Sequence, residues 1–159
     1  MGLIYLDNNA TTKVDPQVLE AMLPYLQDEY ANPSSIYDFA KRANHIVKEA
    51  RGVIKDFVNA ENEKEIIFTS CGSESANTAI RGVLNMNKNK RHIVTTKVEH
   101  PCVLNLYQAL EKEGYTVDYI GVNSNGELDL AQLSDSINAD TALVSICLLY
   151  TSDAADDLT

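Results

Sequence analysis

The stretch Glu65 to Leu84, EIIFTSCGSESANTAIRGVL, decides the fold. It begins with the β-branched and aromatic run Ile66–Thr69, which is typical of a buried strand in a parallel sheet. Small polar residues follow at Ser70–Ser73, and the apolar residues from Ala76 onward then recur at helical spacing. The stretch therefore predicts a strand, a tight turn and the start of a helix.

The predicted helix start suits a ligand that carries one phosphate. The first backbone N–H groups of a helix have no partner within it, and the macrodipole places partial positive charge there. Gly72 would let the backbone approach the ligand closely, and Ser73 adds a hydroxyl. The pattern matches neither G-x-G-x-x-G nor G-x-x-x-x-G-K-[ST], which disfavours a dinucleotide or a nucleoside triphosphate. The alternative is that this turn only caps the helix.

Composition narrows the class of protein. The length of 159 residues and the 45% apolar content are typical of one soluble globular domain. The formal net charge of -10 argues against nucleic acid and anionic membranes as partners. Neither a membrane-spanning run nor a signal sequence is recognisable, so a cytoplasmic location is expected. The 3 cysteines lack C-x-x-C spacing, so neither a disulfide framework nor a metal site is expected.

Helices and strands alternate along the rest of the chain. We expect helices to begin at Asp15-Pro16, to run along a core over 36–57, to follow Pro101 as far as Gly114, and to follow Asp129. Further strands are expected at 92–96, 115–120 and 141–146, with a turn at Asn125-Gly126. This order implies right-handed crossovers and an α/β fold in three layers, with a mainly parallel sheet flanked by helices.

Two polar segments are expected at one edge of that sheet. Ser70–Ser73 and Lys97–His100 each follow a predicted strand, and ligands of parallel sheets bind beyond the carboxyl ends of the strands. A phosphate near Gly72 and Ser73, with an imidazole beside it, suits a phosphorylated aromatic cofactor. Stacking of its ring on His100 would contribute about 0.5–1.5 kcal/mol by analogy with aromatic pairs. The alternative for His100 is a residue at a helix start that is hydrogen-bonded locally.

Four motifs carry a resemblance to a known family. In order, they are YLDNNATT, NPSSIYDFAKRA, FTSCGSESANTAI and VEHPCVL. Together they resemble the N-terminal part of the cysteine desulfurases, in the class V aminotransferase group of fold type I pyridoxal-phosphate enzymes. The resemblance implies an N-terminal arm at 1–14, which belongs to the small domain in the family, and part of the large cofactor-binding domain at 15–146. Residues 147–159 have no counterpart in that pattern, and we expect them to be foreign or disordered.

The resemblance also implies an activity and a site. Such enzymes remove sulfur from L-cysteine, which leaves L-alanine and an enzyme persulfide for iron-sulfur cluster assembly or thio-modification. By matching position, Gly72 and Ser73 would bind the phosphate of pyridoxal 5'-phosphate, with the serine where relatives often have threonine. His100 would stack on the cofactor ring and assist proton transfers as a catalytic residue. The implied partners are a second copy of the chain and an iron-sulfur scaffold or another acceptor protein.

Three groups that this chemistry requires have no match here. They are the Schiff-base lysine, the aspartate on the pyridinium nitrogen and the cysteine that accepts sulfur. In the family all three follow the last matching residue, so we expect this chain alone to be inactive. A selenocysteine lyase, another class V enzyme and a non-catalytic domain that binds a phosphate ligand remain as alternatives.

Overall fold

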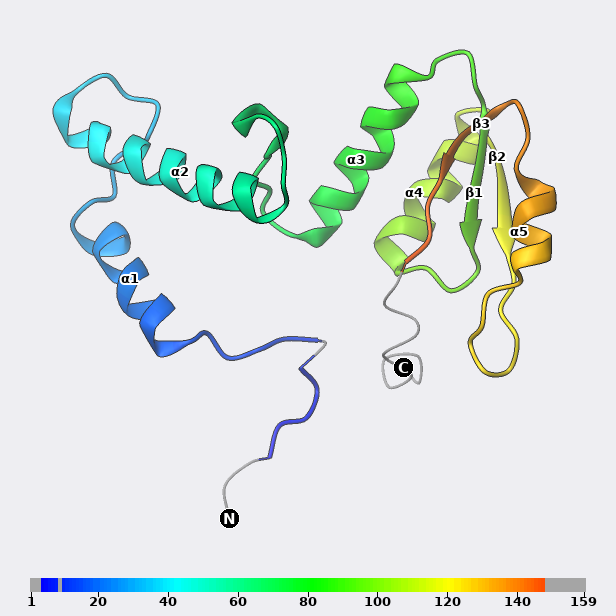
Figure 1. The fold of residues 1–159 in the computed structure, drawn as a ribbon, viewed down its shortest axis with the longest axis horizontal. Helices are drawn as coiled ribbons and strands as arrows, with labels where there is room; N and C mark the ends of the chain where they lie inside the picture. Colours follow the sequence, from blue (N-terminus) through cyan, green and yellow to red (C-terminus); the bar gives the residue numbers. More distant parts are fainter. Residues whose placement is uncertain (1–3, 9, 148–159) are drawn as a thin grey trace. The chain divides into compact units, whose positions relative to one another are not determined.

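The computed structural model describes residues 4–8 and 10–147, and these fall into two compact units (Figure 1). The first unit comprises residues 1–68 and the second residues 69–159. The expectations for residues 148–159 lie outside the described residues. Each unit has its own architecture.

The first unit is helical. Helix α1, Pro16–Gln27, begins as predicted, because the Asp15 carboxylate accepts a hydrogen bond of 2.8 Å from the backbone N–H of Gln17. Proline occupies its first turn, where the missing N–H costs nothing. Pro24 does not end the helix, which continues to Gln27. The 3₁₀ turn η1, Glu63–Glu65, completes the described elements of this unit.

Helix α2, Asp38–Phe57, is the longest described helix, but it buries less than its apolar spacing predicts. Its buried residues are Ala40 and Ala43. Ile36 precedes the helix and is 93% exposed, and Phe57 at its end is 85% exposed. The expectation of packing along a core therefore holds only near the start of α2, because an apolar stripe is buried only where another surface faces it.

The strand expected at Ile66–Thr69 is wrong. These residues pair with no strand among the described residues, and Ile67 is 71% exposed. The run instead contacts Arg51 of α2, whose Nε donates to the carbonyl of Ile66 and whose guanidinium lies 5.0 Å from the centre of the Phe68 ring. β-branched composition favours a strand only where a neighbouring strand completes the hydrogen-bond ladder.

The second unit contains a parallel sheet of three strands. These are β1 His92–Thr96, β2 Thr116–Ile120 and β3 Thr141–Val144, in the order β2-β1-β3. Helix α3, Gly72–Met86, leads into β1, while α4, Pro101–Lys112, and α5, Leu130–Ser136, connect the strands in turn. The predicted α/β class and parallel sheet are confirmed, although β3 ends before the expected Ile146.

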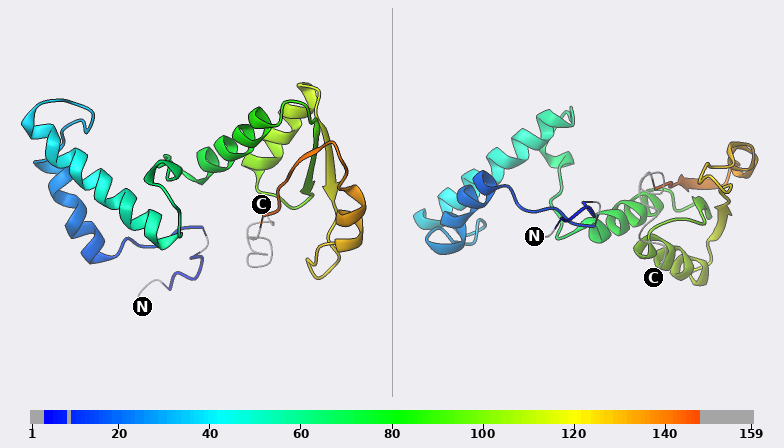
Figure 2. Two further views of the ribbon diagram at one scale, coloured as in Figure 1. Left: turned by 45° about the horizontal axis from the view of Figure 1, so that its top comes forward. Right: turned by 90° about the horizontal axis from the view of Figure 1, so that it is seen from below.

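Helices α3 and α4 bury the core of this unit against the sheet. Ile93 of β1 packs in one cluster with Leu84 of α3 and Leu110 of α4. Full burial of such a side chain contributes about 1.5–3 kcal/mol. Figure 2 shows α5 on the side of the sheet away from α4, which gives three layers.

Turn residues separate these elements as predicted. Gly114, with φ +91°, follows the last turn of α4, and Gly126, with φ +79°, lies in the turn after β2. Both backbone conformations favour glycine. The side chain of Asp129 accepts a hydrogen bond of 2.9 Å from the N–H of Gln132, which caps α5.

Candidate cofactor-binding site

The N-terminus of α3 is accessible at Gly72 and Ser73, the residues predicted to bind phosphate. The residue before the helix, Cys71, has an extended backbone and makes no side-chain cap hydrogen bond. A Cβ placed on Gly72 would meet no atom within 4 Å. Ser73 is exposed, and its hydroxyl makes no hydrogen bond to the described residues. The first backbone N–H groups of α3 and the Ser73 hydroxyl are therefore accessible to a ligand.

The same turn stabilises negative charge. The Glu74 carboxylate accepts hydrogen bonds of 2.6 Å from the hydroxyl and the backbone N–H of Ser70, and these hold its pKa below the ordinary value. The pKa of the Cys71 thiol is also lowered, chiefly by the backbone N–H of Glu74 and then by the Ser70 hydroxyl. Of these two shifts, that of Cys71 has the backbone N–H groups at the start of α3 among its causes, and these are the groups that would also hold a phosphate.

His100 is the N-cap of α4. Its Nδ1 accepts a hydrogen bond of 3.2 Å from the backbone N–H of Cys102, and the Cys102 Sγ lies 3.0 Å from the same nitrogen. The local hydrogen bond considered as the alternative for His100 is therefore present. The residue is exposed, and Nε2 makes no hydrogen bond to the described residues. The ring thus caps α4 through one nitrogen and leaves the other available.

One side chain joins the two helix starts. The Asn77 amide donates to the carbonyl of Ser73 at 2.8 Å and to the carbonyl of Cys102 at 3.3 Å. The first turns of α3 and α4 are therefore neighbours. In Figure 1 both helices begin at the end of the unit to which the arrows of β1 and β2 point. Gly72, Ser73 and His100 consequently belong to the same edge of the sheet, although no paired strand precedes α3.

Glu99 is buried at this edge of the sheet and joins two segments there. The sequence placed it only in a loop. Glu99 is 2% exposed, and its Oε1 accepts from the Thr96 hydroxyl at 2.9 Å and from the N–H of Cys147 at 2.7 Å. These bonds connect the segment before His100 to the segment after β3. The sequence offered one signal for it, a carboxylate placed between a buried strand and a helix cap.

Another histidine, His92, has a structural role. His92 is 5% exposed, its Nδ1 lies 2.8 Å from the Thr141 hydroxyl, and its Nε2 lies 3.1 Å from the Asp118 carboxylate. The ring therefore bridges β1 to both neighbouring strands. Sequence reasoning assigned it only to the strand.

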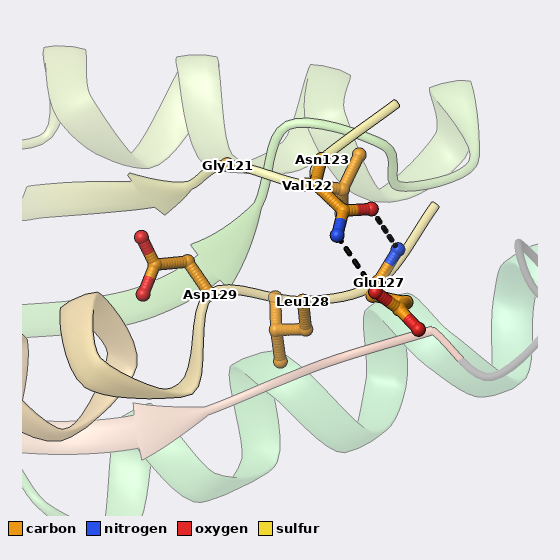
Figure 3. Close-up of a pocket in the computed structure, with 6 residues that line it drawn as sticks. All are labelled: Gly121, Val122, Asn123, Glu127, Leu128 and Asp129. Atoms are coloured by element: carbon orange, nitrogen blue, oxygen red, sulfur yellow. Dashed lines mark hydrogen bonds between the residues drawn. The ribbon is translucent and has the colours of Figure 1, made fainter. Parts of the chain in front are cut away.

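A hollow of about 370 Å³ lies in the loop that follows β2 (Figure 3). Its polar side chains are engaged with the loop itself, since Asn123 Nδ2 donates to Glu127 Oε2 at 2.7 Å and the Glu127 N–H donates to Asn123 Oδ1 at 3.0 Å. Asp129, at its other end, caps α5. None of the predicted site residues lines this hollow, and its groups serve the turn around Gly126.

Two kinds of feature are absent from residues 4–8 and 10–147. No group of three or more His, Cys, Asp or Glu side chains there could hold a metal ion. None of the helices there is long and apolar enough to cross a membrane.

The fold and the site define a class of protein. It is a parallel α/β protein with an uncapped helix start and a capping histidine at one edge of its sheet. The family model described as aminotransferase class-V matches residues 4–153, and the chain belongs to that family.

The most informative relatives are cysteine desulfurases and proteins of their fold. The chain is 54% identical over 146 residues to a cysteine desulfurase from Nostoc sp., an alignment that covers 92% of this chain and 36% of the relative. A solved structure of a NifS-like protein matches with a TM-score of 0.83 at 39% identity, over 90% of this chain and 39% of that one. The structure of SspA in complex with cysteine matches with a TM-score of 0.80 at 38% identity, over 89% of this chain and 41% of that one. The chain thus spans about a third of the length of the curated relatives it matches.

Proposed function

We propose that this chain forms the phosphate-binding part of a pyridoxal-phosphate-dependent cysteine desulfurase. The observation that carries the proposal is the accessible start of α3, which no side chain caps and which Asn77 holds beside the capping histidine of α4. Similarity to desulfurases supports the reaction, and the similar protein SspA forms a complex with cysteine, the amino acid that this activity consumes.

The residues at the start of α3 fit a phosphate group. The N–H groups of Gly72 and Ser73 and the hydroxyl of Ser73 would hold its oxygens, because they are accessible and nothing crowds Gly72. Glu74 does not compete for that position, since its carboxylate bonds to Ser70. When bound, pyridoxal 5'-phosphate supplies an electron sink for bond cleavage at an amino acid.

His100 supplies the second part of the site. Its exposed imidazole would lie against the cofactor ring, a contact of about 0.5–1.5 kcal/mol by analogy with aromatic pairs. The hydrogen bond from Cys102 to Nδ1 orients the ring and leaves Nε2 available to contact the substrate, where His100 would assist proton transfer. We assign His100 the catalytic role and Gly72 and Ser73 the binding role.

The full reaction needs groups beyond those assigned here. The C–S bond of L-cysteine breaks, L-alanine leaves, and the sulfur passes to an acceptor cysteine as a persulfide. None of the lysines or cysteines of this chain matches the cofactor-bonding lysine or that acceptor, so we propose that the chain alone is inactive. We further propose a homodimer, a cytoplasmic location and an iron-sulfur scaffold or other sulfur-acceptor protein as partner.

The cofactor site is tested by calorimetric titration of the chain with pyridoxine 5'-phosphate and with pyridoxine, neither of which has an aldehyde to react with lysines. The phosphate form should bind at least about tenfold more tightly, because hydrogen bonds to charged groups contribute about 1.5–3 kcal/mol. Ser73→Ala should reduce this preference, while Ser124→Ala, at another exposed serine, should leave it unchanged. Equal affinity for the two compounds would contradict the assignment of Gly72 and Ser73.

The reaction is tested on a longer frame. A gene that continues through the family's lysine and acceptor cysteine should yield a protein that releases alanine from L-cysteine, while the 159-residue chain releases none. Turnover of selenocysteine but not of cysteine would replace the proposal with a selenocysteine lyase.

A further inference from the structure

The hydrogen bonds at His100 determine which ring nitrogen carries the proton. A backbone N–H can only donate, so the Nδ1 that receives the Cys102 N–H at 3.2 Å must present its lone pair. The neutral ring therefore carries its proton on Nε2. The Cys102 Sγ, at 3.0 Å from Nδ1, is placed to donate to the same lone pair.

We propose that His100 is held as the Nε2–H tautomer by the cap of α4, and that it presents a hydrogen-bond donor to the ligand at this edge of the sheet. The inference rests on the proposed function for the identity of that ligand, a phosphorylated pyridine compound. A neutral imidazole in this tautomer offers a hydrogen-bond donor at Nε2 and has no lone pair there to accept one. His100 consequently meets the ligand as a hydrogen-bond donor.

Cys102 is the positioning residue in this arrangement. Its backbone N–H fixes the tautomer and its thiol supports the same nitrogen, so both act through His100. The carbonyl of Cys102 is held in turn by Asn77 of α3 at 3.3 Å. Buried Glu99 restrains the chain on the other side of His100 through Thr96 and Cys147. The imidazole is therefore oriented from both sides.

The tautomer can be read directly from the ring nitrogens. The whole chain, labelled with ¹⁵N-histidine, is studied by long-range ¹H–¹⁵N correlation under alkaline conditions in which imidazole is neutral. His100→Asn identifies the His100 signals by their loss, because asparagine is an equally good N-cap and keeps α4 folded. The expected pattern is a protonated Nε2 and an unprotonated Nδ1. A proton on Nδ1, or averaging between the two nitrogens, would overturn the inference.

A second variant separates the amide from the thiol. Cys102→Ala removes the thiol and keeps the N–H, so the Nε2–H tautomer should persist. Its loss would show that the amide cap does not fix the tautomer. The measurement uses neither cofactor nor turnover, so it stands apart from the proposed function. If the expected tautomer is found but pyridoxine 5'-phosphate does not bind, the proposed function alone is refuted. If pyridoxine 5'-phosphate binds but the tautomer is not the expected one, the inference alone is refuted.

Discussion

The two units of the chain bury their apolar residues to very different extents. Among the described residues of the first unit, Ala40 and Ala43 are the buried hydrophobics. In the second unit both faces of β1 are buried, and Tyr107 and Leu110 of α4 are 0% and 1% exposed. A sheet gives helices a continuous apolar surface to cover, whereas an amphipathic helix without such a surface leaves its stripe exposed.

Packing between the helices of the first unit is correspondingly loose. A hollow of about 260 Å³ is lined by residues of α1, of the loop after it and of α2, including Tyr25, Ala43 and Ile46. At its side Glu29 bonds to Arg42 at 2.8 Å through Oε1, while Oε2 is buried and has no hydrogen-bond partner among the described residues. We expect the first unit, in contrast to the second, to tolerate most substitutions of a large side chain by a smaller one.

The largest expected effect tests that contrast with one residue type. Leu110→Ala in α4 should destabilise the second unit by about 2–5 kcal/mol, because it opens a cavity in a close-packed cluster. Leu26→Ala in α1 should change the free energy of unfolding by no more than about 0.5 kcal/mol, because Leu26 is 67% exposed. Urea unfolding followed by circular dichroism measures both values. Equal losses for the two variants would break the comparison.

A smaller effect is expected at Ala40, the fully buried position of α2. Ala40 is 0% exposed, so Ala40→Leu should cost about 1–3 kcal/mol by overpacking. Ala50→Leu, at an exposed position of the same helix, should cost almost nothing, since the two residues have similar helix propensities. Thermal unfolding of α2 by circular dichroism compares them. If Ala40→Leu proves harmless, the first unit lacks close packing even there, and the contrast between the units is greater.

Local signals in the sequence predicted most of the second unit. Pro101 and Gly114 bracket α4 as expected, and the β-branched runs that became β1, β2 and β3 are correctly assigned. The failures concern longer-range packing. Ile66–Thr69 has strand composition without a paired strand, and Ile36 and Phe57 continue an apolar stripe that nothing in the described unit covers. The pattern of apolar residues in the sequence indicates which secondary structure a segment favours. It does not show whether another strand or helix lies beside that segment in the fold.

The candidate site was predictable in position and less so in detail. The histidine after β1 could be placed at the sheet edge from the order of strands and helices, whereas the Gly-Ser turn lies near it through Asn77 and not through the strand predicted before it. The support beneath them depends on long-range contacts, such as Asn77 with Cys102 and Glu99 with Cys147. No local spacing encodes those pairs, so sequence reasoning missed them.

The smallest expected effect compares the starts of α1 and α3. The start of α1 is closed by Asp15, whereas no side chain caps α3, and the thiol of Cys71 benefits from its amides. Because the pKa of Cys71 in the folded chain lies below its ordinary value, the thiolate persists to lower pH in the folded chain than in the unfolded chain. The folded chain should therefore be alkylated faster at Cys71 between those two pKa values. Above the ordinary value, where both states are ionised, the advantage should disappear.

Peptide mass spectrometry of iodoacetamide adducts across pH measures this difference at Cys71 separately from the other cysteines. Ser70→Ala should move the profile toward higher pH, because the Ser70 hydroxyl is one cause of the lowered pKa. Inorganic phosphate should slow the reaction if it binds the same N–H groups, since it would then compete with the thiolate for them. Identical profiles for the folded and urea-unfolded chains would mean that the start of α3 does not stabilise the Cys71 thiolate.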